Sequence, residues 1–334
     1  MARFEERGPR IPVLHPIRVD KVHPRAKALG RFVAFVAVVV AIVMLLPVLI
    51  MGITAFKSRG DVMVSPPKIL FTPTLEGFVY LLTDRAVANA SRLEELERNA
   101  EAGKLKMFDR IALENGQEIT GPSSYVFRLW NSVIIAGIST VASVVLGLFA
   151  AYAFSRFKVP GKDDLMFFIL STRMLPAVVV TIPLFLMYRQ LGLHDKHLGM
   201  IILYTVFNLS FSVWLLKGFI DEIPKEYEEA ALVDGYTRMQ AFFKIVLPQA
   251  VTGIAATTVF CLIFAWNEYA FALMLTSQRA RTAPPSIATM MGRGGIEWTA
   301  IAAGSLGFLI PVVIVTFALR KYLLRGITFG AIRG

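Results

Sequence analysis

Six long apolar stretches constrain this sequence more than any other feature. Phe32–Phe56 has no charged residue over 25 positions. As a helix it would rise about 37 Å, more than the roughly 30 Å hydrocarbon core of a bilayer. Five further apolar stretches follow it: Leu129–Phe154, Leu165–Tyr188, Leu198–Leu216, Leu247–Leu275 and Trp298–Leu319. The chain is therefore predicted to be an all-α membrane protein with six transmembrane helices.

The composition agrees with this prediction. Of the 334 residues, 55% are hydrophobic and 18% are charged, whereas soluble domains have about 25% charged residues. The only cysteine, Cys261, lies inside an apolar stretch, which excludes a disulfide within the chain and a metal site built on cysteine spacing. Several stretches contain proline, which lipid-embedded helices tolerate with a kink, and we expect kinks at these positions: Pro47, Pro176, Pro183 and Pro311.

The basic residues predict the orientation of the chain in the membrane. If the N-terminus is cytoplasmic, the inside segments carry 19 Lys or Arg and the short outside loops carry 5. The positive-inside rule then places both termini in the cytoplasm. This distribution accounts for the net charge of +11 without a nucleic-acid partner. The first apolar stretch is longer than the roughly 7–15 residues of a signal-peptide core, so we expect it to be retained.

These spans divide the chain into five segments. They are a basic cytoplasmic segment 1–31, a first transmembrane helix 32–56, an extracytoplasmic loop 57–127, a core of five transmembrane helices 128–320 and a cytoplasmic tail 321–334. Within the long loop, Ser91–Glu118 is dense in Glu, Lys and Arg and predicts a solvated helix and turn. It is either a decoration without an active role or a docking surface for an extracytoplasmic partner.

The segment 217–247, between the fourth and fifth spans, is patterned rather than irregular. Pro224 suits the first turn of a helix, acidic residues follow it, and Gly235 suits a left-handed C-cap. Thr237 and Gln240 then have capping-box spacing. Two short helices at an angle are predicted, and on pattern alone such a hairpin could also lie in the lipid headgroups.

The residues of this segment resemble the EAA motif of permease subunits in binding-protein-dependent ABC importers. Glu229-Ala230-Ala231, then Gly235, then the run from Ile245 to Pro248 stand in the order and spacing of that motif. The resemblance implies a type I ABC importer permease fold, in which this loop is a coupling helix seated in a cleft of a cytoplasmic ATPase. Glu229 would make the polar contact, Ala230 and Ala231 would pack into the groove, and Gly235 would make the turn. The full coupling set implied is Glu229, Ala230, Ala231, Asp234, Gly235, Leu247 and Pro248.

Other short motifs resemble the carbohydrate-uptake branch of these permeases, the maltose-permease type. They are Asn131-Ser132, Leu191-Gly192-Leu193, Asp234-Gly235, Trp266-Asn267-Glu268-Tyr269 and the tail from Phe329 to Gly334. The resemblance implies a multi-pass protein of the bacterial inner membrane, with 128–320 as the permease core and the EAA loop at 217–247. The implied partners are an ATPase dimer, a second homologous permease, an extracytoplasmic solute-binding protein and membrane lipid.

The chain is expected to have no catalytic activity of its own. It contains no G-x-x-x-x-G-K-[ST] sequence, so ATP and Mg are expected to bind to the partner ATPase rather than here. His194 and His197 flank Asp195 without a further ligand placed to complete a zinc site. We therefore expect neither a cofactor nor a metal in this chain.

Two charged residues lie inside apolar stretches, where a charge costs about 2.5–3.5 kcal/mol on insertion scales. Arg173 and Glu268 would either make hydrogen bonds at a helix end or subunit interface, or line the path of the solute. Candidate residues for that path are Tyr204, Asn208, Trp266, Asn267 and Glu268, with helix packing as the alternative for each. The alternative function is an ion-coupled secondary carrier that uses Arg173 and Glu268. A membrane-embedded enzyme is a third possibility, for which no catalytic constellation is found.

Overall fold

In a computed structural model, described for residues 24–66, 68–292 and 295–330, the chain is mostly helical. Within these described residues, four helices are each long and apolar enough to cross a membrane. They are α1 (Pro24–Ala55), α6 (Tyr125–Arg156), α9 (His197–Asp221) and α16 (Trp298–Gly330). The first, second, fourth and sixth predicted spans are thus continuous helices.

The third and fifth predicted spans are bent pairs of helices. α7 (Lys162–Ser171) and the short η1 (Thr172–Met174) meet α8 (Ala177–Gln190) at 91°. The segment from α11 (Arg238–Ala241) through η2 (Phe242–Val246) to α12 (Leu247–Gln249) meets α13 (Val251–Trp266) at 74°. The described residues therefore contain six spans if each bent pair crosses as one unit.

The breaks have identifiable causes. Pro176 is extended, with φ −60° and ψ 130°, and it separates α8 from η1, as expected where proline excludes the preceding residue from helix. Pro47, Pro183 and Pro311 instead lie inside α1, α8 and α16, which continue through them. The predicted stretch Leu247–Leu275 is not one helix, because α13 ends at Trp266 and a separate α14 (Ala270–Leu275) follows.

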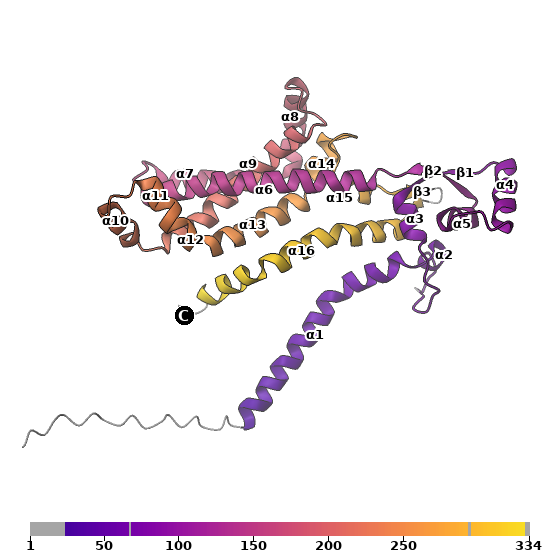
Figure 1. Cartoon of the computed structure of the whole chain (residues 1–334), viewed down its shortest axis with the longest axis horizontal. Helices are drawn as coiled ribbons and strands as arrows, with labels where there is room; N and C mark the ends of the chain where they lie inside the picture. The colour runs from indigo at the N-terminus through magenta and orange to yellow at the C-terminus, as the bar shows by residue number, and fades with distance from the viewer. Residues whose placement is uncertain (1–23, 67, 293–294, 331–334) are drawn as a thin grey trace, which may run out of the picture. The chain divides into compact units, whose positions relative to one another are not determined.

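The described residues fall into two compact units, whose boundary lies between Ile50 and Met51 within α1. In the second unit α6 packs along α9, α13 lies against both, and α16 packs on α13 and α3 (Figure 1). Glycine permits two of these close contacts. A Cβ at Gly147 would lie 2.3 Å from Ser212 Oγ, and one at Gly253 would lie 2.4 Å from the Phe219 ring, so larger residues would separate the helices.

Two clusters of buried side chains fill the helix bundle of the second unit. The first includes Tyr188, Met200, Tyr204, Trp266 and Phe271 from α8, α9, α13 and α14. The second includes Tyr152, Ile220, Phe242, Val246 and Cys261, and it lies where α6 and α9 end. The second cluster joins the patterned loop to the bundle.

The segment before α6 contains short helices and a two-stranded sheet. It has α2 (Arg59–Val62), α3 (Glu76–Leu82), β1 (Thr83–Val87), α4 (Ala90–Glu101), α5 (Met107–Glu114) and β2 (Gln117–Pro122). β1 pairs antiparallel with β2, with a register shift between Asp84 and Arg85. The prediction of one solvated helix and a turn over Ser91–Glu118 is thus corrected to two helices between paired strands. The sheet escaped prediction because its strands are joined by a long connection rather than a tight turn.

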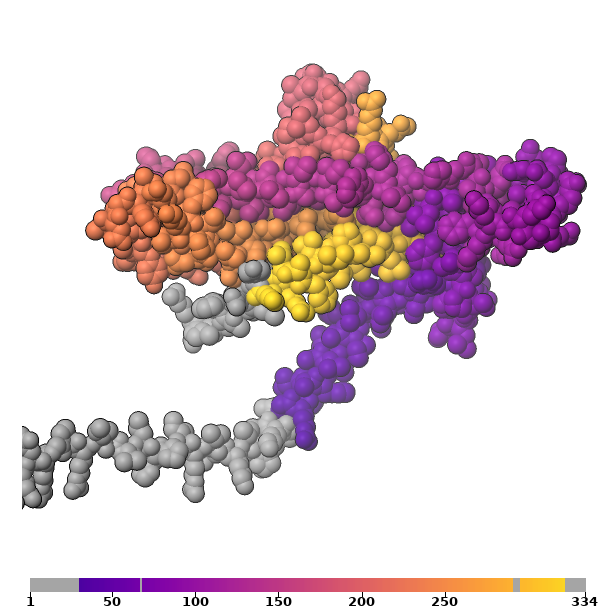
Figure 2. All heavy atoms as spheres, in the orientation of Figure 1, coloured from indigo at the N-terminus to yellow at the C-terminus, as the bar shows by residue number. Residues whose placement is uncertain are grey.

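Opposite ends of α6 carry different structures (Figure 1). At one end lies the loop end, defined as residues 221–250 with α10 (Glu226–Val233), drawn in orange in Figure 2. At the other lies the hairpin end, defined as residues 76–128, 283–292 and 295–303. It includes β1, β2, α15 (Ala283–Ala288) and the paired β3 (Met291–Gly292) and β4 (Gly295–Ile296). Which end faces the cytoplasm stays a prediction from the charge distribution.

Candidate functional site

The loop end has the local structure that its sequence predicts. α10 carries three acidic residues in its first turn, and Gly235 follows it with φ +86°. The Thr237–Gln240 capping box forms: Gln240 N donates to Thr237 Oγ1 at 3.3 Å, and Thr237 N donates to Gln240 Oε1 at 2.8 Å. The prediction of two short helices is confirmed.

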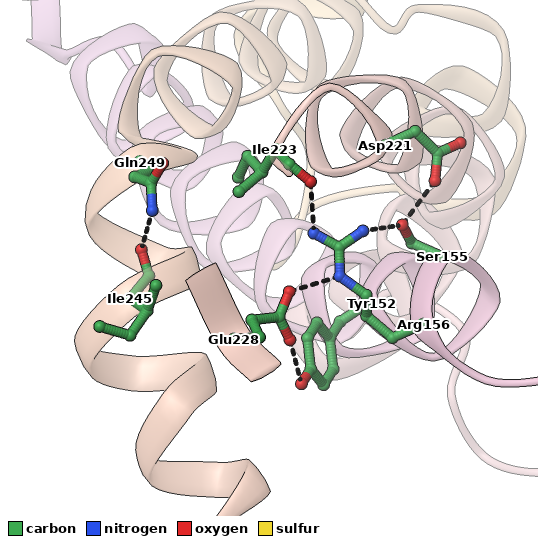
Figure 3. A network of polar contacts seen from close by, with 8 residues as sticks. All are labelled: Tyr152, Ser155, Arg156, Asp221, Ile223, Glu228, Ile245 and Gln249. Carbon is green, nitrogen blue, oxygen red and sulfur yellow. Dashed lines mark hydrogen bonds and ion pairs between the residues drawn. The ribbon is translucent and has the colours of Figure 1, made fainter. Parts of the chain in front are cut away.

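A buried ion pair fixes α10 to the end of α6 (Figure 3). Arg156 Nε donates to Glu228 Oε1, and the two side chains are only 5% and 8% exposed. Tyr152 Oη, one turn earlier on α6, donates to Glu228 Oε2 at 2.9 Å. Both carboxylate oxygens therefore have donors, the condition under which a buried charge is tolerated.

The same arginine connects α10 to α9. Its Nη2 donates to the carbonyl of Ile223 at 2.9 Å, and its Nη1 donates to Ser155 Oγ at 2.9 Å. Ser155 Oγ in turn donates to Asp221 Oδ1 at 2.5 Å. The network in Figure 3 thus joins α6, α9 and α10 through the hydrogen bonds of Arg156 and Ser155.

The outward face of the loop end carries exposed apolar side chains beside the acidic Glu229 and Asp234. Val233 is 88% exposed, Met239 58% and Tyr227 53%, and Glu229, Ala230, Asp234 and Gly235 are exposed as well. Ala231 is 6% exposed and packs inward, whereas Leu247 is half-buried and Pro248 exposed. Of the two alanines expected to pack into a partner's groove, Ala230 is therefore exposed, whereas the helix turns Ala231 toward its own chain. That these residues contact a partner stays a prediction.

A second candidate site is a cavity of about 260 Å³ in the bundle. Arg173, Tyr204, Asn208 and Glu268 line it, together with Phe264. Three of the five predicted path residues thus come together here, with both intramembrane charges.

Glu268 acts as a helix cap in this structure. Its Oε1 accepts from Phe271 N at 2.8 Å and its Oε2 from Ala272 N at 3.0 Å, and Tyr204 Oη donates to Oε2 at 2.7 Å. The guanidinium of Arg173 instead lies over the Phe264 ring at 4.1 Å, a cation–π arrangement. The charge of Glu268 is met by dipoles at the N-terminus of α14, not by Arg173.

The two remaining path candidates lie elsewhere. Trp266 Nε1 donates to the carbonyl of Phe308 at 3.2 Å, and its ring stacks on the Phe308 ring at 4.8 Å. Asn267, just after α13, is exposed, and its Nδ2 donates to the carbonyl of Ile263 in the last turn of α13 at 2.8 Å. Both make helix-packing and helix-end contacts.

Asp195 fastens two loops together, and nothing in its sequence context predicted this. It adopts φ +54°, and its carboxylate accepts from the four backbone N–H groups of residues 277–280. Partial burial on its own raises the pKa of Asp195. The hydrogen bonds from these four amides together lower it by more, so that the pKa lies well below the ordinary value of 3.8.

Sequence reasoning missed the residues that hold the loop end in place. Glu228 stands next to the predicted Glu229, and only its position on the inward face of α10 distinguishes the two. Arg156 and Tyr152 are one turn apart at the end of a span, a spacing that places both on one helix face. A basic residue one turn from a tyrosine at a helix end is a weak signal for a buried glutamate partner.

The sequence profile of one protein family matches residues 143–329, and its description is "Binding-protein-dependent transport system inner membrane component". The "Trehalose transport system permease protein SugB" of Mycobacterium tuberculosis is 37% identical over 67% of this chain and 83% of its own length. The "Trehalose/maltose transport system permease protein MalG" of Thermococcus litoralis is 28% identical over 93% of this chain and 99% of its own.

A solved structure has the same fold. It is the crystal structure of a bacterial ABC transporter involved in the import of the acidic polysaccharide alginate. One of its chains matches with a TM-score of 0.61 and 20% identity, over 90% of this chain and 98% of that chain. At this identity the match bears on the fold alone.

Proposed function

This chain belongs to the family of binding-protein-dependent transport system inner membrane components, the multi-pass permeases of ABC importers, and from that premise we propose that it carries a sugar, polyol or glycoside. The support is the order of its carbohydrate-branch motifs and the names of two relatives, a trehalose permease and a trehalose/maltose permease. The solute would be delivered by an extracytoplasmic binding protein.

The loop end is the part of the chain that would couple transport to ATP hydrolysis. ATP and Mg would bind to a separate ATPase dimer, and this chain would be a non-catalytic subunit paired with a second permease. One observation carries the proposal: α10 exposes Val233, Tyr227 and Glu229 while Glu228 fixes it to α6 through Arg156. Apolar exposed residues beside an acidic one suit a protein partner.

The mechanism that follows is mechanical. When the ATPase dimer closes on ATP, it would displace α10, and the rigid Glu228–Arg156–Ser155 network would pass the displacement to α6 and α9. Because α13 packs on both helices, the bundle would rearrange around the cavity at Tyr204 and Asn208. No observation favours an ion-coupled carrier, since Glu268 is already hydrogen-bonded and is not paired with Arg173.

The test changes the exposed face without touching the network. Val233→Asp should abolish co-purification of the ATPase in mild detergent while the chain still inserts in the membrane, because it places a charge on an apolar contact surface. Met107→Asp is the matched control, since Met107 is a 58% exposed residue of the hairpin end. If Val233→Asp retained the ATPase and sugar uptake at the level of the control, the coupling role of α10 would be wrong.

A further inference from the structure

The hairpin end contains a larger cavity than the bundle does. It measures about 590 Å³ and lies between β1, β2 and α3 on one side and the first turns of α6 and α16 with α15 on the other. Figure 1 shows these elements gathered around the start of α6. Small-molecule sites occupy about 300–1,000 Å³, so this cavity is of ligand size.

A buried carboxylate with unused hydrogen-bonding capacity lines this cavity. Glu297, just before α16, is 2% exposed. Neither of its oxygens accepts a hydrogen bond from any residue in the described part of the chain. Arg59 Nη1 lies 3.5 Å from Oε1, which compensates charge but is too long for a strong hydrogen bond. A buried acceptor left in this state costs about 1–3 kcal/mol, and a bound donor would remove that cost.

The facing wall supplies donors in a fixed arrangement. The Arg85 guanidinium lies 3.5 Å above the Tyr80 ring, and its Nη1 donates to Gln117 Oε1 at 2.9 Å, whereas its Nε–H has no acceptor in the described residues. Burial and the nearby Glu76 carboxylate raise the pKa of Tyr80. Its hydroxyl therefore stays protonated at physiological pH and can donate or accept.

The charges around the cavity balance. Asp84 and Glu297 are acidic, and Arg85 and Arg128 are basic. Glu297 would repel an anion bound in the cavity. Arg85 and Arg128 in the lining, with Arg59 near Glu297, would repel a cation. A neutral molecule with many hydroxyl groups satisfies both sets, because each hydroxyl donates to a carboxylate and accepts from a guanidinium.

We propose that this cavity is a second carbohydrate-binding site, at which a neutral sugar makes hydrogen bonds with Glu297 and Arg85 before it enters the bundle. The choice of a sugar as ligand rests on the proposed function. The cavity itself contains no residue of the loop end. It assigns the hairpin end a direct role in receiving the solute.

The experiment uses the full chain, purified with whatever subunits accompany it, and a thiol at the mouth of the cavity. Ala86 lines the cavity and is exposed, and the only native cysteine, Cys261, is fully buried. Ala86→Cys therefore provides one reactive thiol whose maleimide alkylation rate is measured with and without glucose, maltose or trehalose. Ala102→Cys, exposed at the end of α4, is the matched control.

At least one of these sugars should slow alkylation at Ala86→Cys several-fold and leave Ala102→Cys unchanged. Adding Glu297→Gln to Ala86→Cys should remove the protection, because an amide replaces one acceptor oxygen. If no sugar protects, or if arginine or phosphate protects better than any sugar, the proposal is overturned. Should Glu297→Gln fail to fold, Ala86→Trp narrows the mouth instead, and it should lower the stoichiometry of bound tritiated sugar by one molecule per chain, whereas an unchanged stoichiometry overturns the proposal.

The outcome is separable from that of the proposed function. Protection without a co-purifying ATPase would preserve the sugar site and reject the importer role. A co-purifying ATPase without protection would preserve the importer role and reject the site at the hairpin end.

Discussion

Two buried glutamates at opposite ends of the bundle have opposite surroundings. Glu228 at the loop end receives hydrogen bonds from Arg156 and Tyr152, one on each carboxylate oxygen. Glu297 at the hairpin end is 2% exposed and has no hydrogen bond on either oxygen among the described residues. The first carboxylate is saturated by its own chain, and the second lines a cavity with its acceptors unused.

This difference indicates what each end does. A saturated buried ion pair holds two elements in one geometry, which suits a part that transmits displacement. An unsaturated buried carboxylate is retained at a cost to stability, which suits a part that binds a ligand. Three of the following predictions alter one of these ends, and the other alters Asp195, a carboxylate that lies at neither end.

The largest effect is expected from Arg156→Ala. Removing one partner of a buried ion pair leaves the other uncompensated and typically costs about 3–5 kcal/mol. α10 should detach from α6, and sugar-dependent ATP hydrolysis by the reconstituted complex should fall by about tenfold or more. Sugar protection of Ala86→Cys at the hairpin end should persist. Lys217→Ala is the control, because the ion pair of Lys217 with Asp221 is more exposed. If Arg156→Ala hydrolysed ATP as fast as Lys217→Ala, the coupling role of the network would be refuted.

A smaller effect is expected from Gly235→Val. Gly235 has φ +86° and open space around its Cα, so the penalty is one of backbone conformation and amounts to about 1–2 kcal/mol. The turn after α10 should shift, and ATPase activity coupled to transport should fall several-fold. Gly235→Asn should restore most of it, because asparagine tolerates positive φ. Gly218→Ala in α9 controls for glycine replacement alone. If it lost as much coupled ATPase activity as Gly235→Val does, the turn after α10 would be unimportant.

The sequence predicted the loop end better than the hairpin end, for a physical reason. Helix signals are local: the capping box at Thr237, the positive φ at Gly235 and the six apolar spans each follow from neighbours within a few residues. The hairpin end is built from long-range contacts, since β1 pairs with β2 and α16 packs on α3. No short pattern encodes those contacts.

The sequence also did not predict which face of the short helix α10 is buried. Glu228 and Glu229 are chemically identical neighbours, yet only Glu228 meets Arg156. The cap at Glu268 was one of two alternatives raised, and the structure forms it through the amides of Phe271 and Ala272. Tyr204 and Asn208 line the bundle cavity, but contact with a solute stays a prediction for both.

Asp195→Asn should have a local effect with a defined pH dependence. Asparagine tolerates the φ of +54° but lacks the charge that strengthens the bonds from residues 277–280. Because the pKa of Asp195 in the folded protein lies below 3.8, its contribution is complete above that value and is lost as the pH falls below it. Amide hydrogen exchange at residues 277–280 should accelerate several-fold in the variant, equally at every pH from about 5 to 8.

The exchange experiment has a clear contrary outcome. A variant effect that grew between pH 5 and 8 would show that another titrating group, not the Asp195 carboxylate, holds these loops together. Asp109→Asn in the first turn of α5 is the control, since Asp109 lies outside both loops. Unlike Glu297, Asp195 has its acceptors filled, so the comparison separates a carboxylate that fastens loops from one that faces a cavity.

The smallest effect is expected from Arg92→Ala on the charged insertion. Arg92 donates to Glu95 at 2.7 Å and to Glu118 at 2.9 Å, but all three side chains are at least 26% exposed. Exposed pairs of this kind are screened and contribute little, so the thermal midpoint and the uptake rate should match wild type within error. A drop in uptake at an unchanged midpoint would instead identify Ser91–Glu118 as a docking surface. The hairpin end would then contact the binding protein as well as the sugar, whereas the loop end would still act on the ATPase alone.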